Sequence, residues 1–312
     1  MRASTAKYKG RGKSRSNGPS LQHFSRFSLS FQEYQFPNLA KMFFKTSSSL
    51  LLLSLLASFT AAHSHVDEIW VNDVHYSGWN PNDPTVPYPN TTPGWFTTNQ
   101  GGNPLYPIDA NQNQIICGKG GSPANFSASI PAGSTVRPKW WAPGDWPVSH
   151  HGPVLNYLAA CNGPCSKVNP ADLKFVKISH KGWINATTYS EGYWASDALR
   201  DDNNSWNIKI PSGLKAGEYV VRHEIIALHL ADLGTGAYST GGAEFYPSCI
   251  SVKVTGAGTK TIAGGVGAKT FYRGDEPGLL VKNIHTTSDH ADYVIPGPAI
   301  WTGALTKRGF SA

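Results

Sequence analysis

Short segments in which apolar and polar residues alternate recur through the chain, and this pattern limits the possible folds more than any other feature. A period of two residues is that of a half-buried antiparallel β-strand. Gly and Pro together supply 54 of the 312 residues, which favours turns over long helices. We therefore expect one all-β sandwich with long loops over 76–115, 142–170 and 230–245. The alternating segments are 69–74, 134–141, 173–178, 205–210, 217–228 and 250–254.

We expect that none of the N-terminal 62 residues belongs to the folded domain. Residues 42–62 combine a basic start, a leucine-rich core and small residues ending in Thr60-Ala61-Ala62, as in a secretory signal peptide. We expect a secreted, extracellular protein whose first mature residue is His63, with a cut before His65 as the alternative. Residues 1–41 are either a non-folding extension or an artefact of an upstream start codon.

The net charge of +7 comes from this leader. Residues 1–45 hold nine of the 27 Lys and Arg but one acid, Glu33, which leaves 18 basic and 19 acidic side chains in the rest. The basicity therefore gives no reason to expect a nucleic-acid partner. No run of eighteen apolar residues occurs, so we expect no membrane span.

Four cysteines follow the leader. An even count in a secreted chain predicts two disulfides with three possible connectivities. A four-cysteine zinc site is the alternative, but the spacings of 44, 4 and 84 lack the second close pair that such sites use. Four N-glycosylation sequons also fit secretion, at Asn90, Asn125, Asn185 and Asn203.

Histidines are the candidate ligands. Six of the ten that follow the leader fall into the pairs His63/His65, His150/His151 and His223/His229, and imidazole is the commonest transition-metal ligand. An N-terminal His63 offers both its amino group and its ring, and a second imidazole then completes a nitrogen-rich site that suits Cu(II). The alternation over 217–228 makes His223 semi-buried and in need of a hydrogen-bond partner.

Four further motifs follow the leader: SHHGPVLNYLA at 149–159, RHEIIALH at 222–229, EFYPSC at 244–249 and YVIPGP at 293–298. They resemble the signatures of the fungal lytic polysaccharide monooxygenases, Auxiliary Activity family 9, once classed as glycoside hydrolase family 61. They occur in the family's order and, with His63, span nearly the whole mature chain to about Gly303. The resemblance implies a single immunoglobulin-like antiparallel β-sandwich with long loops over 63–303, followed by a short tail, 304–312.

The same resemblance implies roles for individual residues. His63 and His150 would hold one copper ion per chain, with Tyr246 as the axial phenol. His229 would be the nearby histidine that hydrogen-bonds oxygen species, so the expected catalytic set is His229, Glu244 and Tyr246. The chain departs from the commonest pattern at Glu244, where many members carry Gln.

The resemblance also implies structural and substrate-binding residues. The disulfides would be Cys117–Cys249 and Cys161–Cys165, and the short loop of the second would stiffen the chain just after the second copper ligand. Tyr293 would stack on a glucose ring of the substrate. Tyr88, in the 76–115 loop, is a second candidate for the same role.

The implied activity is copper-dependent cleavage of cellulose or a related β-1,4-glucan by hydroxylation at C1, C4 or both. It would use O₂ or H₂O₂ and electrons from a small reductant or a secreted haem dehydrogenase, in a monomeric enzyme. Two alternatives belong to other classes: a non-catalytic secreted protein that binds copper or polysaccharide, and an endoglucanase. The second would need two carboxylates across the scissile bond, roughly 5–10 Å apart.

Overall fold

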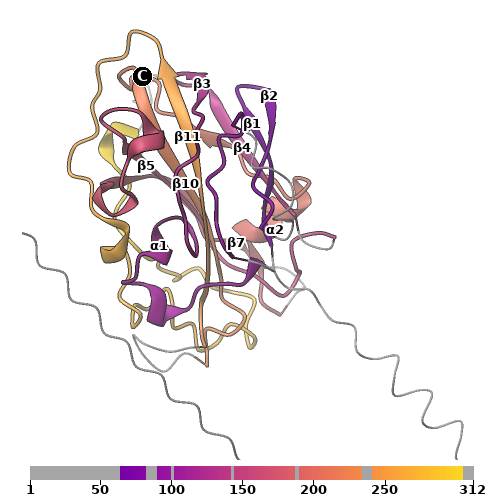
Figure 1. Cartoon of the computed structure of the whole chain (residues 1–312). Helices are drawn as coiled ribbons and strands as arrows, with labels where there is room; N and C mark the ends of the chain where they lie inside the picture. Colours follow the sequence, from indigo (N-terminus) through magenta and orange to yellow (C-terminus); the bar gives the residue numbers. More distant parts are fainter. Residues whose placement is uncertain are drawn as a thin grey trace, which may run out of the picture. The chain divides into compact units, whose positions relative to one another are not determined.

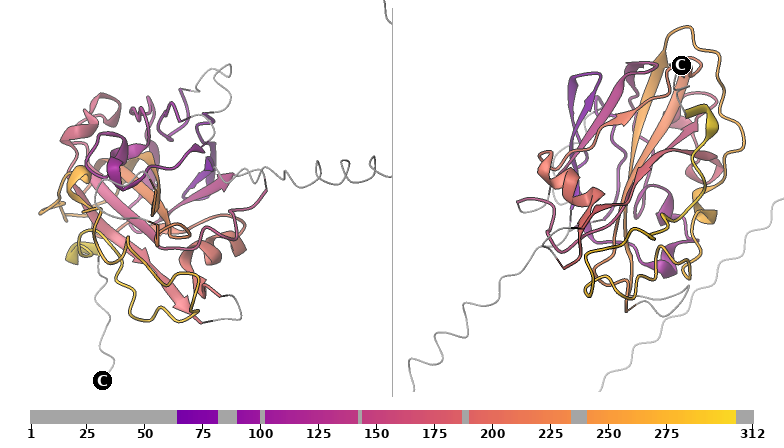
Figure 2. Two further views of the ribbon diagram at one scale, coloured as in Figure 1. Left: turned by 90° about the horizontal axis from the view of Figure 1, so that it is seen from below. Right: turned by 180° about the vertical axis from the view of Figure 1, so that it is seen from behind.

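The computed structural model describes residues 64–81, 90–99, 102–141, 144–186, 190–233 and 241–304. His63, Tyr88 and the whole leader lie outside these ranges. Two β-sheets face each other in the described part, and loops and short helices cover them (Figures 1 and 2). The predicted β-sandwich is therefore confirmed. No helix among the described residues has the length and apolar character needed to cross a membrane.

The smaller sheet has four antiparallel strands and the larger one five. The smaller sheet has the order β2 (Val74–Ser77), β1 (His65–Val71), β4 (Thr135–Trp141) and β9 (Ile208–Lys209). In the larger sheet the order is β3 (Ala128–Pro131), β11 (Glu244–Thr255), β10 (Gly217–Ala227), β5 (Val154–Ala160) and β6 (Phe175–Lys181). Its β3–β11 pair is parallel, which departs from the all-antiparallel expectation.

The remaining elements are short. β7 and β8 form a small two-stranded ribbon, and short helices and 3₁₀ turns lie in the connections. Their bounds are β7 Trp183–Asn185, β8 Tyr193–Trp194, α1 Gln114–Cys117, α2 Ala195–Asp201, η2 Pro107–Asp109, η3 Cys165–Lys167, η4 Pro170–Asp172, η5 Ala268–Thr270 and η6 Thr302–Ala304.

The larger sheet is buried on both faces. Val221 and Ile225 of β10 lie in the core between the sheets, whereas Val220 and Ile226 lie in a second core under α1 and the C-terminal segment. Burial on both faces explains why β5 is a nearly continuous apolar run rather than an alternating one. The expectation of an uninterrupted loop over 142–170 is accordingly wrong, because β5 lies within it.

Both predicted disulfides are present. Cys117–Cys249 joins α1 to the middle of β11, under the second core. Cys161–Cys165 lies at the far end of β5 from His150, because seven residues of strand separate them and each advances the chain by about 3.3 Å. The expectation that this disulfide stiffens the neighbourhood of His150 is therefore wrong.

One end of the sandwich gathers strand ends from both sheets. In the larger sheet β10 ends beside the starts of β5 and β11, since it is antiparallel to both. In the smaller sheet β1 begins beside the end of β4. The ring of Trp140 near the end of β4 lies 6.5 Å from that of Tyr246 near the start of β11, so the two sets of ends meet. This is the lower end of the sandwich in Figure 1.

Candidate metal centre

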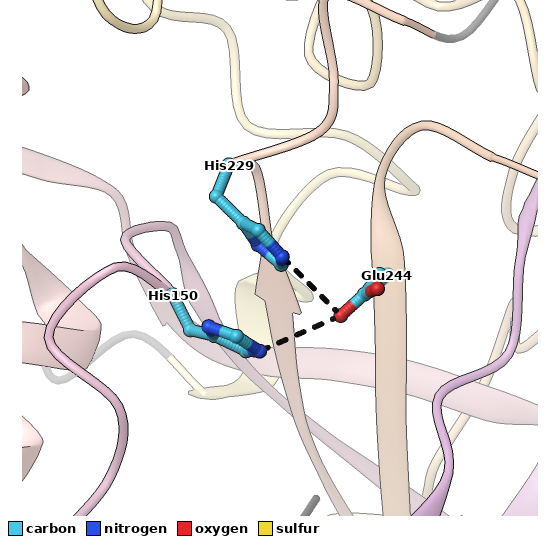
Figure 3. Close-up of side chains that lie close together, drawn as sticks. All are labelled: His150, His229 and Glu244. Carbon is cyan, nitrogen blue, oxygen red and sulfur yellow. Dashed lines mark ion pairs between the residues drawn. The ribbon is translucent and has the colours of Figure 1, made fainter. Parts of the chain in front are cut away.

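Three potential ligands converge where β5, β10 and β11 meet. His150 precedes β5, His229 follows β10, and Glu244 is the first residue of β11 (Figure 3). Their positions follow from the register of three neighbouring strands, so residues 94 positions apart become neighbours. One ligand atom from each lies within 4.8 Å of those of the other two.

The two imidazoles lie against each other and face the carboxylate. Their rings stack with centroids 4.0 Å apart and 20° between the planes. Oε2 of Glu244 lies 3.7 Å from Nε2 of His150 and 3.9 Å from Nε2 of His229. The Ser149 hydroxyl lies 3.1 Å from Nδ1 of His150, so the opposite ring nitrogen, Nε2, is the one directed at the cluster.

Tyr246 completes the cluster from the next inward-facing position on β11. Its hydroxyl donates a 2.7 Å hydrogen bond to Oε2 of Glu244. Its ring meets Trp146 edge-on at 5.2 Å, and Trp146 in turn donates from Nε1 to the carbonyl of His150 at 3.1 Å. The tyrosine and the histidine are thus held by one buried tryptophan.

Burial sets the protonation states of the cluster. It lowers the pKa of His229 to about 4, with smaller repulsion from His285 and His151, so this ring is neutral at neutral pH. It also raises the pKa of Tyr246 well above 10, and the neighbouring Glu244 charge adds to this effect. The pKa of Glu244 is raised by burial and lowered by the hydrogen bond from Tyr246, and burial dominates.

These residues fit a transition-metal ion. Neutral imidazole nitrogens with phenol and carboxylate oxygens are donors that copper accepts. Nε2 of His150 and Nε2 of His229 both face Oε2 of Glu244, so the donor atoms converge on one point. The sequence-predicted His150, His229, Glu244 and Tyr246 are therefore brought together as a centre that could hold copper.

The start of β1 lies at the same end of the sandwich as this cluster. A cavity of about 50 Å³ is lined by Ser64 and His65 from the start of β1 and by Trp140 and Tyr246 from β4 and β11, among others. The Ser64 hydroxyl donates to the carbonyl of Trp141 at 2.7 Å, which fixes the residue next to His63. His65 is paired within β1, with its ring 5.3 Å from that of Trp141.

The predicted substrate residue Tyr293 lies away from these contacts. Its ring meets Trp194 edge-on at 4.8 Å, and its hydroxyl donates to the carbonyl of Gly278 at 2.9 Å. The side chain is partly exposed, so its role in binding stays a prediction. The four sequon asparagines, Asn90, Asn125, Asn185 and Asn203, are all exposed, as glycosylation requires.

The structure also shows residues that sequence reasoning missed. His151 Nδ1 lies 2.9 Å from Asp197, and Glu191 lies 3.1 Å from Nδ1 of His285. His285 then donates from Nε2 to the carbonyl of His229 at 2.8 Å. No local pattern marks the acids or His285, because they come from segments distant in the sequence.

The hydrogen-bond partner expected for His223 is present, but the side chain is fully buried rather than semi-buried. Its side chain is fully buried and its Nε2 accepts from Nε1 of Trp140 at 2.9 Å. The remaining ring proton therefore sits on Nδ1 and is donated to the amide oxygen of Asn156 at 2.7 Å. His223 is thus a structural link between the two sheets.

Comparisons with known proteins identify one family. The family model described as "Auxiliary Activity family 9 (formerly GH61)" matches residues 63–293. A lytic polysaccharide monooxygenase, G, of Emericella nidulans is 44% identical over 80% of this chain and 89% of its own. A second, H, of Thermothelomyces thermophilus is 42% identical over 84% of this chain and 72% of its own.

Solved structures show the same likeness. The extended catalytic domain of H. jecorina LPMO9A is 37% identical, with a TM-score of 0.69 over 77% of this chain and 92% of that one. A cellulose-active polysaccharide monooxygenase from M. thermophila is 28% identical, with a TM-score of 0.63 over 77% of this chain and 99% of that one.

Proposed function

Because this chain belongs to Auxiliary Activity family 9, the copper-dependent lytic polysaccharide monooxygenases, we propose that it cleaves cellulose or a related β-1,4-glucan, at C1, C4 or both. The convergence of His150, His229, Glu244 and Tyr246 at one end of the sandwich carries this proposal. The similar M. thermophila enzyme whose title names it cellulose-active supports the choice of polymer.

One copper ion per chain would be held by the amino group and ring of His63, by Nε2 of His150 and by the Tyr246 hydroxyl. The ion supplies the one-electron chemistry toward O₂ or H₂O₂ that no side chain provides. Ser64, which follows His63, lines the same cavity as Tyr246, and this supports the ligand set. His65 is less suited as the N-terminal ligand, because its backbone is already paired in β1.

The surrounding residues would orient groups and hold protons. Glu244 fixes the direction of the Tyr246 hydroxyl by accepting its proton in a hydrogen bond. Neutral His229 can donate or accept a hydrogen bond at Nε2, whereas its backbone carbonyl is held by His285. Trp146 positions both Tyr246 and the His150 backbone, so the centre is preorganised before substrate binds.

The processing of the chain is part of the proposal. Members of this family are secreted fungal proteins. The match to the family model begins at residue 63, which supports cleavage of a 42–62 signal peptide and a mature domain over 63–303 with the tail 304–312. Two disulfides and four exposed sequon asparagines are consistent with export.

The remaining partners follow from the reaction. We propose a monomer that takes electrons from a small reductant or a secreted haem dehydrogenase. Tyr293 and Tyr88 remain the proposed substrate contacts. A balance of 18 basic against 19 acidic residues after the leader supports a neutral polymer rather than a nucleic acid as partner.

The proposal is tested by the products released from cellulose. Copper-loaded enzyme with ascorbate should release oligosaccharides whose masses show oxidation at one end, and omission of ascorbate should abolish their release. Unoxidised sugars without a reductant would instead identify a hydrolase. Copper binding without any soluble product would identify a non-catalytic binding protein.

A further inference from the structure

Trp141 is an outlier among the tryptophans. All ten lie within the described residues, and Trp141 alone is exposed, at 43% of its surface. The others are buried or half-buried, as indole side chains are expected to be in a folded domain. Folding of this domain therefore does not account for the exposed indole.

The position of Trp141 places it at the rim of the metal centre. It is the last residue of β4, opposite His65 in the register with β1, and its carbonyl accepts the hydrogen bond from Ser64. The preceding residue, Trp140, points inward to Tyr246. Because side chains alternate along a strand, Trp141 points outward from the same strand end.

A second exposed apolar side chain comes seven residues later in the sequence. Val148 is 68% exposed and stands two residues before His150. The two exposed side chains therefore bracket the segment that leads from β4 to the ligand. The Trp141 ring is supported by the neighbouring ring of His65, with centroids 5.3 Å apart and 47° between the planes.

We infer that Trp141 is a substrate contact, on which a glucose ring of the polymeric β-1,4-glucan stacks; this inference rests on the proposed function. The axial C–H groups of a glucose ring form an apolar face that matches an indole face. The indole of Trp141 is exposed beside the proposed metal centre, so it is accessible to a polymer that binds there. A polymer surface extends beyond the metal centre, so it can reach a ring at the rim.

The test measures binding to microcrystalline cellulose without a reductant, so that it does not depend on turnover. Trp141→Ala should weaken binding about fivefold, which corresponds to ~1 kcal/mol. Trp141→Tyr keeps a flat ring and should retain most of the affinity. The matched control is Trp70→Ala, which removes a half-buried tryptophan paired with Arg137, at the other end of the β1–β4 ladder.

The outcomes separate this inference from the proposed function. Wild-type affinity in Trp141→Ala, or an equal loss in Trp70→Ala, would overturn the inference while leaving oxidised products from the wild type as evidence for the function. If the wild type releases no oxidised product, the proposed function fails whatever the binding data show. Sedimentation gives a third outcome that would overturn the inference. If the measured molecular mass rises with protein concentration for the wild type but not for Trp141→Ala, the Trp141 ring mediates a contact between copies of the protein.

Discussion

The hydroxyl of Tyr246 donates a 2.7 Å hydrogen bond to Oε2 of Glu244, and the same oxygen faces Nε2 of both His150 and His229. One carboxylate oxygen thus joins the phenol to two imidazoles. The resemblance to the family implies Gln as the commoner residue at this position, and an amide offers a donor that a carboxylate lacks.

Glu244→Gln should change the reaction rate and leave copper binding nearly unchanged. The amide can donate a hydrogen bond toward the reaction site, and it removes a negative charge that opposes a developing anion. One added hydrogen bond of ~1 kcal/mol predicts a rise of about fivefold in the rate of oxidised-product release. Copper affinity is followed by titration in the same preparation.

The matched control for this substitution is Glu218→Gln. Glu218 lies at the opposite end of β10, where it accepts hydrogen bonds from Ser127 and from the backbone of Cys165. Glu218→Gln should leave the rate of oxidised-product release unchanged. An unaltered rate in Glu244→Gln as well would show that the side chain does not act on the reaction.

The mature protein should begin at His63. The amino group of that residue is a proposed ligand, so any residue left before it would block the site. The mass of the N-terminal peptide of the secreted protein checks this directly. A start at Ser64 or His65 would remove the proposed ligand and rule out the ligand set.

Substitutions of the stacked histidines His150 and His229 should show which of them binds copper and which only lies beside the ion. His150→Ala removes a proposed ligand and should weaken copper binding by about a hundredfold or more, whereas His229→Ala should weaken it by less than about tenfold and mainly lower the rate. Isothermal titration measures the copper affinity of both variants, and the Cu(II) spectrum shows whether their ligands differ from those of the wild type. His75→Ala, at a side chain that is 51% exposed, is the control. Equal losses in both variants would make His229 a ligand too.

The sequence predicts the sandwich and most of the centre, for identifiable reasons. The length of the segment 217–228 predicts β10, whose alternate residues lie in two different buried layers. β5 is shorter and is also buried on both faces, so its continuous apolar run shows no alternation and the pattern misses it. His150, His229, Glu244 and Tyr246 are found through motifs, since each adjoins a strand end that the motif includes.

Contacts between residues that are distant in the sequence cannot be predicted from the local sequence pattern. Glu191 and His285 are 94 residues apart and meet only because of tertiary packing. The expected effect of the Cys161–Cys165 disulfide is wrong for a related reason, since closeness to His150 in sequence does not account for the length of β5. Exposure of Trp141 is likewise invisible in the sequence, because its neighbour Trp140 is the same residue type and is buried.

His180 should make folding stability depend on pH. Burial, with a smaller effect of Lys177, lowers its pKa from 6.5 to about 4 in the folded protein. Between these values the unfolded chain binds a proton that the folded protein does not, so stability is fully present above pH 6.5 and falls as the pH drops toward 4. The loss is on the order of 2 kcal/mol after allowance for partial exposure. His180→Asn should therefore reduce the decline in melting temperature over this range; equal slopes in the wild type and His180→Asn would contradict the assignment.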